Sequence, residues 1–279
     1  MSKLPDDFDW NIYTSINNDL KGFNEEEAKM HYLRHGFSEN RIYKMINLHN
    51  KNVVLITSKI YVSNKKFSYT SNRSIYTIEE RFNQTLETIH SIKKNITNTY
   101  IILFDNSFFA NKDYYNMLNN NVDKFINITN NNTLNFYTDI YQYKAFSDVS
   151  QQLSFYNTFF KYVDMNSFNK FFKISGRYLV NHRFNFNNYN NNANIFKKNN
   201  DVTYRDYYYT CFYKLNSKII HLYFEQLKQL IDNKHLYENT YSDLEVILPK
   251  FLINTNAISL TDTLGITQRI AVNNTIEDI

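Results

Sequence analysis

A strand, helix, strand pattern that starts near residue 53 constrains the fold more than any other feature of the sequence. The run 53–61 (VVLITSKIY) is rich in β-branched residues, apolar residues recur at helical spacing over 78–94, and the run 100–104 (YIILF) is again apolar. Units of this kind build parallel sheets, and their ligands bind at the carboxyl ends of the strands. We therefore predict an α/β fold with substrate-binding residues after the two strands, namely Thr57, Ser58, Asp105 and Asn106.

Further elements of the same kind follow along the chain. Helical spacing predicts helices over 148–163 and about 218–234, and the apolar run 171–174 predicts a buried strand that ends at Ser175-Gly176-Arg177. The Asn-rich segment 185–200 is too polar and repetitive to pack. We expect a mobile loop there, either as codon drift or as a lid over a substrate site.

Size and charge narrow the class of protein. A chain of 279 residues can bury a full core, and its net charge of +4 is too small for a dedicated nucleic-acid binder but suits a small anionic ligand. The chain has one cysteine and no apolar run near the ~18 residues that span a bilayer. We expect a cytoplasmic protein without a nucleic-acid partner.

The first 48 residues predict a small helical module, which leaves 49–279 as the main domain. Asn24 and Glu27 have the spacing of a capping box, and Gly36 can end the helix in a left-handed conformation. Ala28 and Tyr32 share one helix face. A helix pair of this size must pack on the remainder of the chain or on a partner.

Ten residues of this module form a recognisable pattern: Tyr13, Asn17, Asp19, Leu20, Ala28, His31, Tyr32, Gly36, Glu39 and Arg41. The pattern resembles a short helical repeat that accompanies glycosyltransferase domains in bacteria and large DNA viruses, although Asn18 replaces the usual proline. The alternative is that His31 and Arg41 only satisfy the packing of the module.

From residue 53 onward, the stretches VVLITSKIY, ERFNQTLETIHSIKKNI, YIILFDNS and FFKISGRY resemble glycosyltransferases of giant viruses and some bacteria. The order of elements is similar to that of GT-A enzymes, whose Rossmann-like domain holds a nucleotide sugar across the strand ends. The resemblance implies a nucleotide-sugar donor, with UDP expected, a glycan or protein acceptor, and the host cytoplasm or virion as the location. It also places Thr57 and Ser58 near the nucleotide, and Asp105 near a ribose or base. Alternatively, Asp105 is a turn residue in Asp105-Asn106-Ser107.

GT-A enzymes usually hold a divalent ion with an Asp-x-Asp motif, and this chain has Ser175-Gly176-Arg177 at the matching place. Gly176 lets backbone approach a phosphate, and the Arg177 guanidinium suits a departing diphosphate. Each well-placed donor is worth roughly 3 to 4 kcal/mol in the transition state. We therefore favour transfer without a bound metal, with Mn²⁺ or Mg²⁺ left open. Alternatively, Gly176 forms a turn and Arg177 pairs with a surface carboxylate.

Three further cations are candidates for anion binding: Arg73, Arg81 and Lys144. Arg81 falls in the first turn of a helix, where a cation opposes the dipole and needs a partner. A phosphate, Glu79 or Glu80 can fill that role. Lys144 precedes the helix predicted from 148, and a helix start of this kind suits an anion.

A catalytic base is expected late in the chain, where Asp243 and Glu245 are the candidates. Residues two apart on a helix point in different directions, so at most one of them faces the site. Glu245 can also close a capping box with Ser242, and we therefore rank Asp243 first. The prediction is a glycosyltransferase. The alternative is an inactive carbohydrate-binding or assembly protein on the same fold, and a homo-oligomer is left open.

Overall fold

A computed structural model describes most of the chain. The described residues are 3–39, 41–68, 70–163, 167–168, 170–199, 207–236, 244–245, 257–259, 262–271 and 275–279. Within this part of the chain, no helix is long and apolar enough to cross a membrane.

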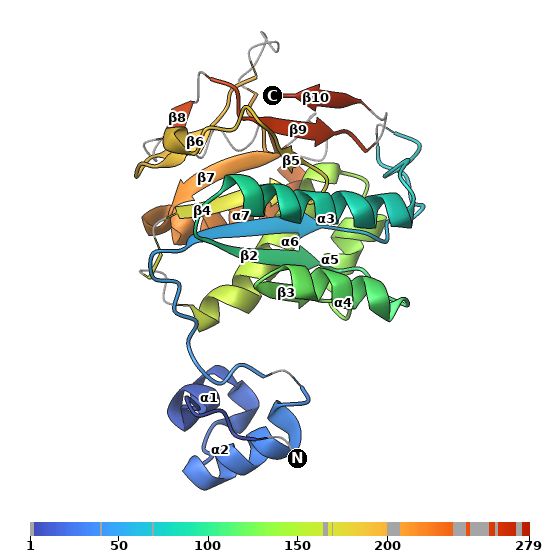
Figure 1. The fold of residues 1–279 in the computed structure, drawn as a ribbon. Helices are drawn as coiled ribbons and strands as arrows, with labels where there is room; N and C mark the ends of the chain where they lie inside the picture. The colour runs from blue at the N-terminus through green and yellow to red at the C-terminus, as the bar shows by residue number, and fades with distance from the viewer. Residues whose placement is uncertain are drawn as a thin grey trace.

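A seven-stranded sheet with the order β3-β2-β1-β4-β7-β6-β8 forms the centre of the main domain (Figure 1). The strands are β1 (Asn52–Ser58), β2 (Thr99–Asp105), β3 (Lys124–Asn127), β4 (Lys170–Ser175), β6 (Asn194–Phe196), β7 (Phe212–Asn216) and β8 (Ala257–Ser259). Strands β1 to β4 run parallel, whereas β7 runs antiparallel to β4 and to β6. The predicted α/β class is therefore confirmed, as a mixed sheet that is mostly parallel.

The strand, helix, strand unit consists of β1, α3 (Ile78–Asn95) and β2. Every residue of β1 is buried, which explains its continuous apolar run. The predicted strand 53–61 ends earlier, at Ser58, because side chains bind the backbone that follows. The Arg81 guanidinium donates to the Lys59 carbonyl, and the Asp105 carboxylate accepts from the Ile60 amide.

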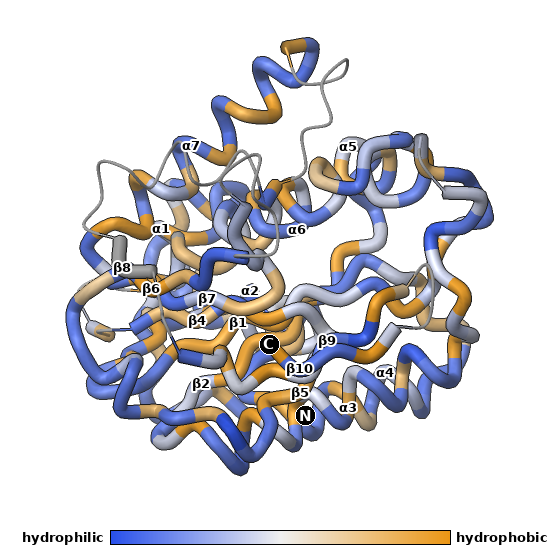
Figure 2. Tube along the Cα trace, turned by 90° about the horizontal axis from the view of Figure 1, so that it is seen from above, coloured by the Kyte–Doolittle hydropathy of each residue, from blue (hydrophilic) through white to orange (hydrophobic). Residues whose placement is uncertain are grey.

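Helices cover both faces of the sheet. Val53 and Leu55 of β1 pack against the face covered by α6 (Lys144–Phe159) and α7 (Ile220–Asp232). Val54 and Ile56 pack against the opposite face, with α3 and α4 (Lys112–Asn121). Successive strand residues point to opposite faces, so two helical layers need an apolar residue at every position of β1. Figure 2 shows hydrophobic residues along the central strands and hydrophilic residues along much of α3.

Two predicted helices are confirmed with shifted ends. The helix predicted over 148–163 is α6, which begins at Lys144 and is followed by a 3-10 turn over Phe160–Tyr162. The helix predicted over 218–234 is α7, with short 3-10 turns on both sides. The short helix α5 (Asn132–Asn135) precedes α6 and buries Leu134 on the same face of the sheet.

A three-stranded sheet lies beside α3, formed by β5 (Leu179–Val180), β9 (Ile266–Arg269) and β10 (Ile276–Asp278). Its buried residues Val180 and Ile266 join the same core cluster as α3. The segments of this sheet extend the main domain over the carboxyl-end side of the central strands.

The expectation of a mobile loop over 185–200 was wrong for the part that the structure describes, 185–199. A 3-10 turn (Phe186–Tyr189) and β6 occupy this segment, and Tyr189 is fully buried against Phe184, with 5.1 Å between the ring centres. Asparagine side chains bind backbone groups here. Asn194 Oδ1, for example, accepts from the backbone amide of Asn216. Spaced aromatic and aliphatic residues anchor the segment. The prediction of a mobile loop rested on average polarity, which does not reveal such spaced residues.

The N-terminal module has a hydrophobic cluster of its own, built on Tyr13, Leu20, Ala28 and Tyr32. It contains α1 (Trp10–Ile16), α2 (Glu25–His31) and a π-helical turn (Tyr32–Gly36), and Figure 1 shows it apart from the main domain. The capping box between Asn24 and Glu27 is confirmed.

The expected role of Gly36 was wrong, because the left-handed glycines are Gly22 and Gly265 in the described part of the chain. A Cβ atom on Gly36 would lie 2.2 Å from the Tyr13 hydroxyl oxygen. Glycine therefore makes room for Tyr13, whose hydroxyl lies 2.9 Å from His31 Nδ1.

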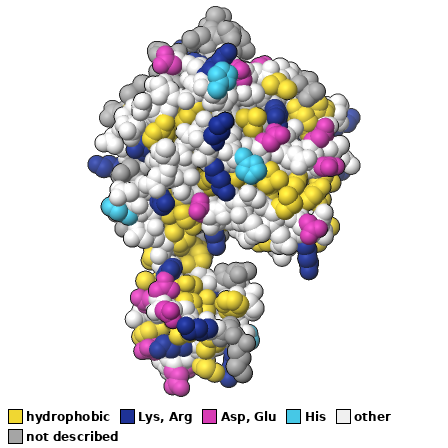
Figure 3. Space-filling model, viewed as in Figure 1, with side chains coloured by type: hydrophobic (Ala, Val, Ile, Leu, Met, Phe, Trp, Pro, Cys, Tyr) yellow, Lys and Arg dark blue, Asp and Glu magenta, His cyan; other side chains and the backbone are white. Residues whose placement is uncertain are grey.

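The remaining residues of the N-terminal pattern bind each other. Arg41 pairs with Asp19 at 2.6 Å and with Glu39 at 2.5 Å. Figure 3 shows acidic and basic side chains close together on the surface of the module. These contacts give His31 and Arg41 structural roles, as the packing alternative expects.

Candidate functional site

A cavity of about 460 Å³ opens at the carboxyl ends of β1 and β4. The chain reverses its direction of travel across the sheet at this point, since β2 and β3 lie on one side of β1 and β4 lies on the other. Such switch points are where open α/β sheets bind ligands. Thr57 and Ser58 line the cavity from the end of β1, and Ser175 and Arg177 line it from the end of β4.

Other walls come from segments far apart in the sequence. They include the loop after β1, the first turn of α3, the start of α6, the segment before β7, and β9 with β10. Polar residues on these walls are Lys59, Arg73, Arg81, Lys144, Asp148, Gln151, Thr210, Glu245, Gln268 and Glu277. Eight of the twelve residues predicted for the site line this cavity: Thr57, Ser58, Arg73, Arg81, Lys144, Ser175, Arg177 and Glu245.

Arg81 is buried, with 5% of its surface exposed. Its guanidinium donates to the Lys59 carbonyl at 2.7 Å and to the Ser74 hydroxyl at 3.0 Å. These partners are neutral, and no ion pair joins Arg81 to Glu79 or Glu80, the alternative to a phosphate, in the described part of the chain. Burial, together with the positive charge of Arg177, holds the pKa of the Arg81 guanidinium well below its usual range. The Asp105 carboxylate acts in the opposite direction, but burial and Arg177 have the larger effects on this cation.

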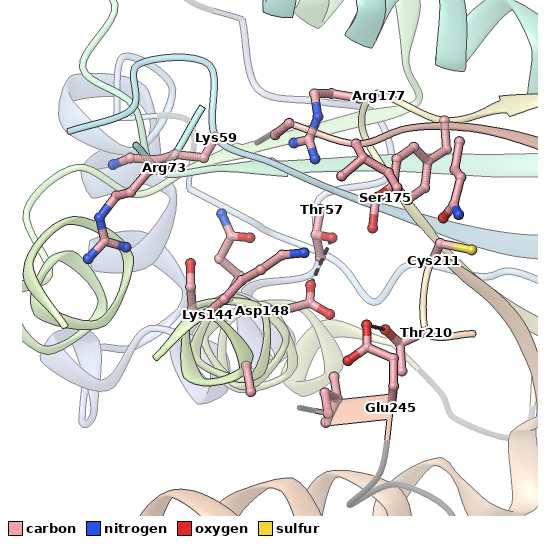
Figure 4. Close-up of a pocket in the computed structure, with 18 of the residues that line it drawn as sticks. Thr57, Lys59, Arg73, Lys144, Asp148, Ser175, Arg177, Thr210, Cys211 and Glu245 are labelled. Carbon is pink, nitrogen blue, oxygen red and sulfur yellow. Dashed lines mark hydrogen bonds between the residues drawn. The ribbon is translucent and has the colours of Figure 1, made fainter. Parts of the chain in front are cut away.

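Arg177 lies beside that buried charge. Figure 4 shows its guanidinium on the cavity side of the end of β4. Its Nε atom is buried and has no hydrogen-bond partner among the described residues, and its guanidinium carbon lies 5.7 Å from the centre of the Tyr178 ring. No ion pair joins Arg177 to a carboxylate in the described part of the chain, in contrast to the alternative of a surface pair. Two adjacent guanidiniums, one of which donates only to neutral groups among the described residues, favour an anion.

Gly176 has a different role from the expected one. It does not line the cavity, and its amide donates to the Thr57 carbonyl at 2.8 Å. A Cβ atom here would lie 3.0 Å from Ser58 Cβ. The glycine therefore lets the ends of β1 and β4 pack closely, and the expectation that its backbone meets a phosphate is not supported by its position.

Asp105 and Asn106 also lie outside the cavity lining. The Asp105 carboxylate accepts from the Ile60 amide at 3.0 Å and from the Ser107 amide at 2.5 Å. The Asn106 side chain donates to the Thr138 hydroxyl at 2.8 Å. Both residues fix the loops behind the site, so the turn interpretation fits and the expectation of direct ligand contact does not.

Arg73 and Lys144 are wall residues. Arg73 is 5% exposed, its guanidinium donates to the Thr138 carbonyl at 3.1 Å, and its charge lies 4.2 Å from the centre of the Phe67 ring. Lys144 is the first residue of α6, where the N-cap residue Tyr143 gives no side-chain hydrogen bond. The amides of this helix start therefore have no side-chain cap beside the cavity.

The late acidic pair is only partly described. Asp243 lies outside the described residues. Glu245 lines the cavity, and its carboxylate accepts from the Thr210 hydroxyl at 2.8 Å. The two described residues of this segment, 244 and 245, are helical as expected.

Sequence reasoning missed a carboxylate that lines the same cavity, Asp148 of α6. It pairs at 2.9 Å with Lys173 of β4, whose side chain is 1% exposed. A lysine inside the apolar run FFKIS requires a buried partner, which was the available signal. The partner itself was not apparent, since it lies 25 residues away on another element.

The described residues do not fit a divalent metal held by acidic ligands. They contain no group of three or more His, Cys, Asp or Glu side chains placed to share an ion. The end of β4 carries Ser175 and Arg177, neither of which is a carboxylate, and Asp148 is already paired with an ammonium group.

No family model matches the chain, and no curated protein matches it. One similar solved structure is the glycosyltransferase GlyE of Streptococcus pneumoniae TIGR4, with 10% identity and a TM-score of 0.44 over 77% of this chain and 46% of that one. This chain thus spans less than half the length of GlyE. Core-mannan synthase A of Aspergillus fumigatus is similar at 8% identity and a TM-score of 0.44, over 73% and 70% of the two chains. Galactosyltransferase LgtC, solved with donor and acceptor sugar analogues, has 10% identity and a TM-score of 0.41, over 71% and 70%.

Proposed function

We propose that this chain is a glycosyltransferase of GT-A-like fold, which moves a sugar from a nucleotide-sugar donor to a glycan or protein acceptor. The carrying observation is the pair of guanidiniums, Arg81 and Arg177, at the switch point of a mostly parallel sheet. A diphosphate would supply further negative charge beside this pair. The volume of about 460 Å³ lies in the range of small-ligand sites.

Catalysis requires stabilisation of the negative charge that develops in the transition state. When the bond between the sugar and the diphosphate breaks, negative charge grows on the departing phosphate oxygens. Fixed donors aimed at these oxygens stabilise the transition state by roughly 3 to 4 kcal/mol each. Arg177 lines the cavity, its Nε atom has no partner among the described residues, and Arg81 adds a second positive charge beside it.

UDP is the expected nucleotide, and we expect Thr57 and Ser58, which line the cavity, to lie near it. Glu245 is the described candidate for the base that accepts the proton of the acceptor hydroxyl. We also propose that residues 1–48 are a separate accessory module, since their hydrophobic cluster is distinct from the two clusters of the main domain.

Isothermal titration of the full chain with UDP, GDP and CDP tests the proposal, with and without Mn²⁺. We expect one nucleoside diphosphate to bind, and to bind without added metal. A chain that binds none of the three contradicts the function. Release of the nucleotide from a nucleotide sugar separates an enzyme from the alternative, a carbohydrate-binding protein, which binds the sugar nucleotide without turnover.

A further inference from the structure

Asp148 is held in one position by three donors from three elements. The Thr57 hydroxyl of β1 donates to Oδ1 at 3.2 Å, while the Lys173 ammonium of β4 and the Gln152 amide of α6 donate to Oδ2 at 2.9 Å and 3.1 Å. The Gln152 side chain is itself fixed, because its oxygen accepts from the Tyr213 hydroxyl at 2.7 Å. A carboxylate with this support cannot rotate without losing bonds at both oxygens.

The carboxylate still has capacity to accept a further hydrogen bond. Each carboxylate oxygen accepts about two bonds, and Asp148 Oδ1 has a single donor, Thr57, among the residues that the structure describes. The side chain is 26% exposed and lines the cavity, whereas Lys173 behind it is 1% exposed. The open acceptor position of Asp148 therefore faces the ligand space, and the counter-charge of Lys173 is buried on the far side.

Figure 4 shows Arg177 on one side of Thr57 and Asp148 on the other, with Glu245 further along. Lys144 also lines the cavity, from the same helix as Asp148. A nucleotide sugar has an anionic diphosphate followed by a ring of hydroxyl groups. A phosphate beside Asp148 would be repelled, while a hydroxyl group would donate to it.

Building on the function proposed above, we propose that Asp148 is the residue that accepts a hydrogen bond from a hydroxyl group of the donor sugar, and that Lys173 is a positioning residue for it. Asp148 then selects sugars with a hydroxyl group at that position. Its ammonium partner keeps the acceptor aimed at the ring.

The test compares the affinity for a nucleoside diphosphate with that for the matching nucleotide sugars of glucose, galactose and N-acetylglucosamine. The measured quantity is the sugar ratio, the dissociation constant of the nucleoside diphosphate divided by that of the nucleotide sugar. This ratio isolates the contribution of the sugar. Asp148→Asn should reduce this ratio roughly 10- to 100-fold for the sugar that binds best, because a charge-assisted bond is lost. Affinity for the diphosphate alone should stay equal or increase, since a nearby negative charge is removed. The control Asp123→Asn alters an exposed carboxylate that caps the Ile101 amide, and should change neither affinity.

If Asp148→Asn fails to fold, Thr57→Val gives the same comparison. The Thr57→Val substitution removes one hydrogen bond to Asp148 and leaves the pair of Asp148 and Lys173 in place. We expect the ratio to fall a few-fold in that variant. A wild-type ratio in Asp148→Asn or in Thr57→Val, in protein that binds the diphosphate, overturns the role of Asp148. A wild-type chain that binds no nucleoside diphosphate contradicts the proposed function instead.

The positioning role of Lys173 has its own readout, the coupling between two substitutions. Lys173→Met should lower the sugar ratio in the wild-type background and have no further effect in Asp148→Asn, because the two residues act as one unit. Lys214→Met is the matched control. Lys214 is a buried lysine on the neighbouring strand β7, and its side chain lies on the opposite face of the sheet, where its ammonium binds Asn191. Additive losses from Lys173→Met and Asp148→Asn would refute the positioning role.

Discussion

Replacing Arg177 with methionine separates a binding role from a structural role. A binding role predicts weaker nucleotide affinity without loss of stability, whereas a structural role predicts lower stability. The Arg177 Nε atom has no hydrogen-bond partner among the described residues, and its charge lies close enough to Arg81 to lower the pKa of that group. Methionine keeps much of the length of the side chain and removes the charge. In the unliganded chain, the substitution should therefore change the free energy of unfolding by no more than about 0.5 kcal/mol, with any change toward higher stability.

Nucleotide affinity should respond much more strongly. A hydrogen bond to a charged group contributes about 1.5 to 3 kcal/mol, and about 1.4 kcal/mol corresponds to a factor of ten in affinity. We therefore expect the dissociation constant for the nucleoside diphosphate to rise roughly 10- to 150-fold in Arg177→Met. Titration calorimetry measures the affinity, and urea unfolding of the unliganded protein measures the stability.

The matched control is Arg183→Met, which removes an exposed arginine from the segment that follows β5 and lies outside the cavity lining. It should change neither quantity. An Arg177→Met protein that is destabilised by more than about 1 kcal/mol, yet binds the diphosphate as the wild type does, would refute the reasoning.

Three further predictions concern the fold. Gly36→Ala should lower the stability of the N-terminal module by about 1 to 3 kcal/mol in thermal unfolding, because the new Cβ atom would lie 2.2 Å from the Tyr13 hydroxyl; an unchanged transition would contradict this. Burial raises the pKa of the Cys211 thiol to about 12, so a disulfide reagent at pH 8 should label it only after unfolding, and fast labelling of the native protein would disprove the packing. Burial lowers the pKa of Lys214 from 10.5 to about 8, so the unfolded chain binds more protons between these values and the stability of the wild type relative to Lys214→Met should rise with pH. Urea midpoints at pH 7.5 and 9.5 measure that difference, and a constant difference would rule it out.

The sequence identified the residues at the switch point because topology determines where strand ends meet. Thr57, Ser58, Ser175 and Arg177 each follow an apolar run, and parallel strands bring the ends of such runs to one edge of a sheet. Hydrophobic period and capping spacing are local properties, so they also placed α3, α6, α7 and the start of α2 within a few residues.

Hydrophobic period and capping spacing could not predict the partners of polar side chains. Arg81 binds a carbonyl of the loop after β1, rather than an acidic neighbour on its own helix. Asp105 binds backbone amides across two loops, and Gly36 makes room for a tyrosine 23 residues earlier in the chain. Each of these contacts depends on how segments cross in space.

The sequence by itself determined the class of the main domain, the edge of the sheet where the cavity opens, and the arginine from the end of β4 that lines it. Only the tertiary structure decided which of the polar residues at that edge are supports and which line the cavity. Asp148 and Lys173 form their pair through packing of α6 on β4, and no periodic pattern along the chain specifies it. Burial of apolar residues follows a short repeat, whereas pairing of buried charges depends on the orientation of two separate elements.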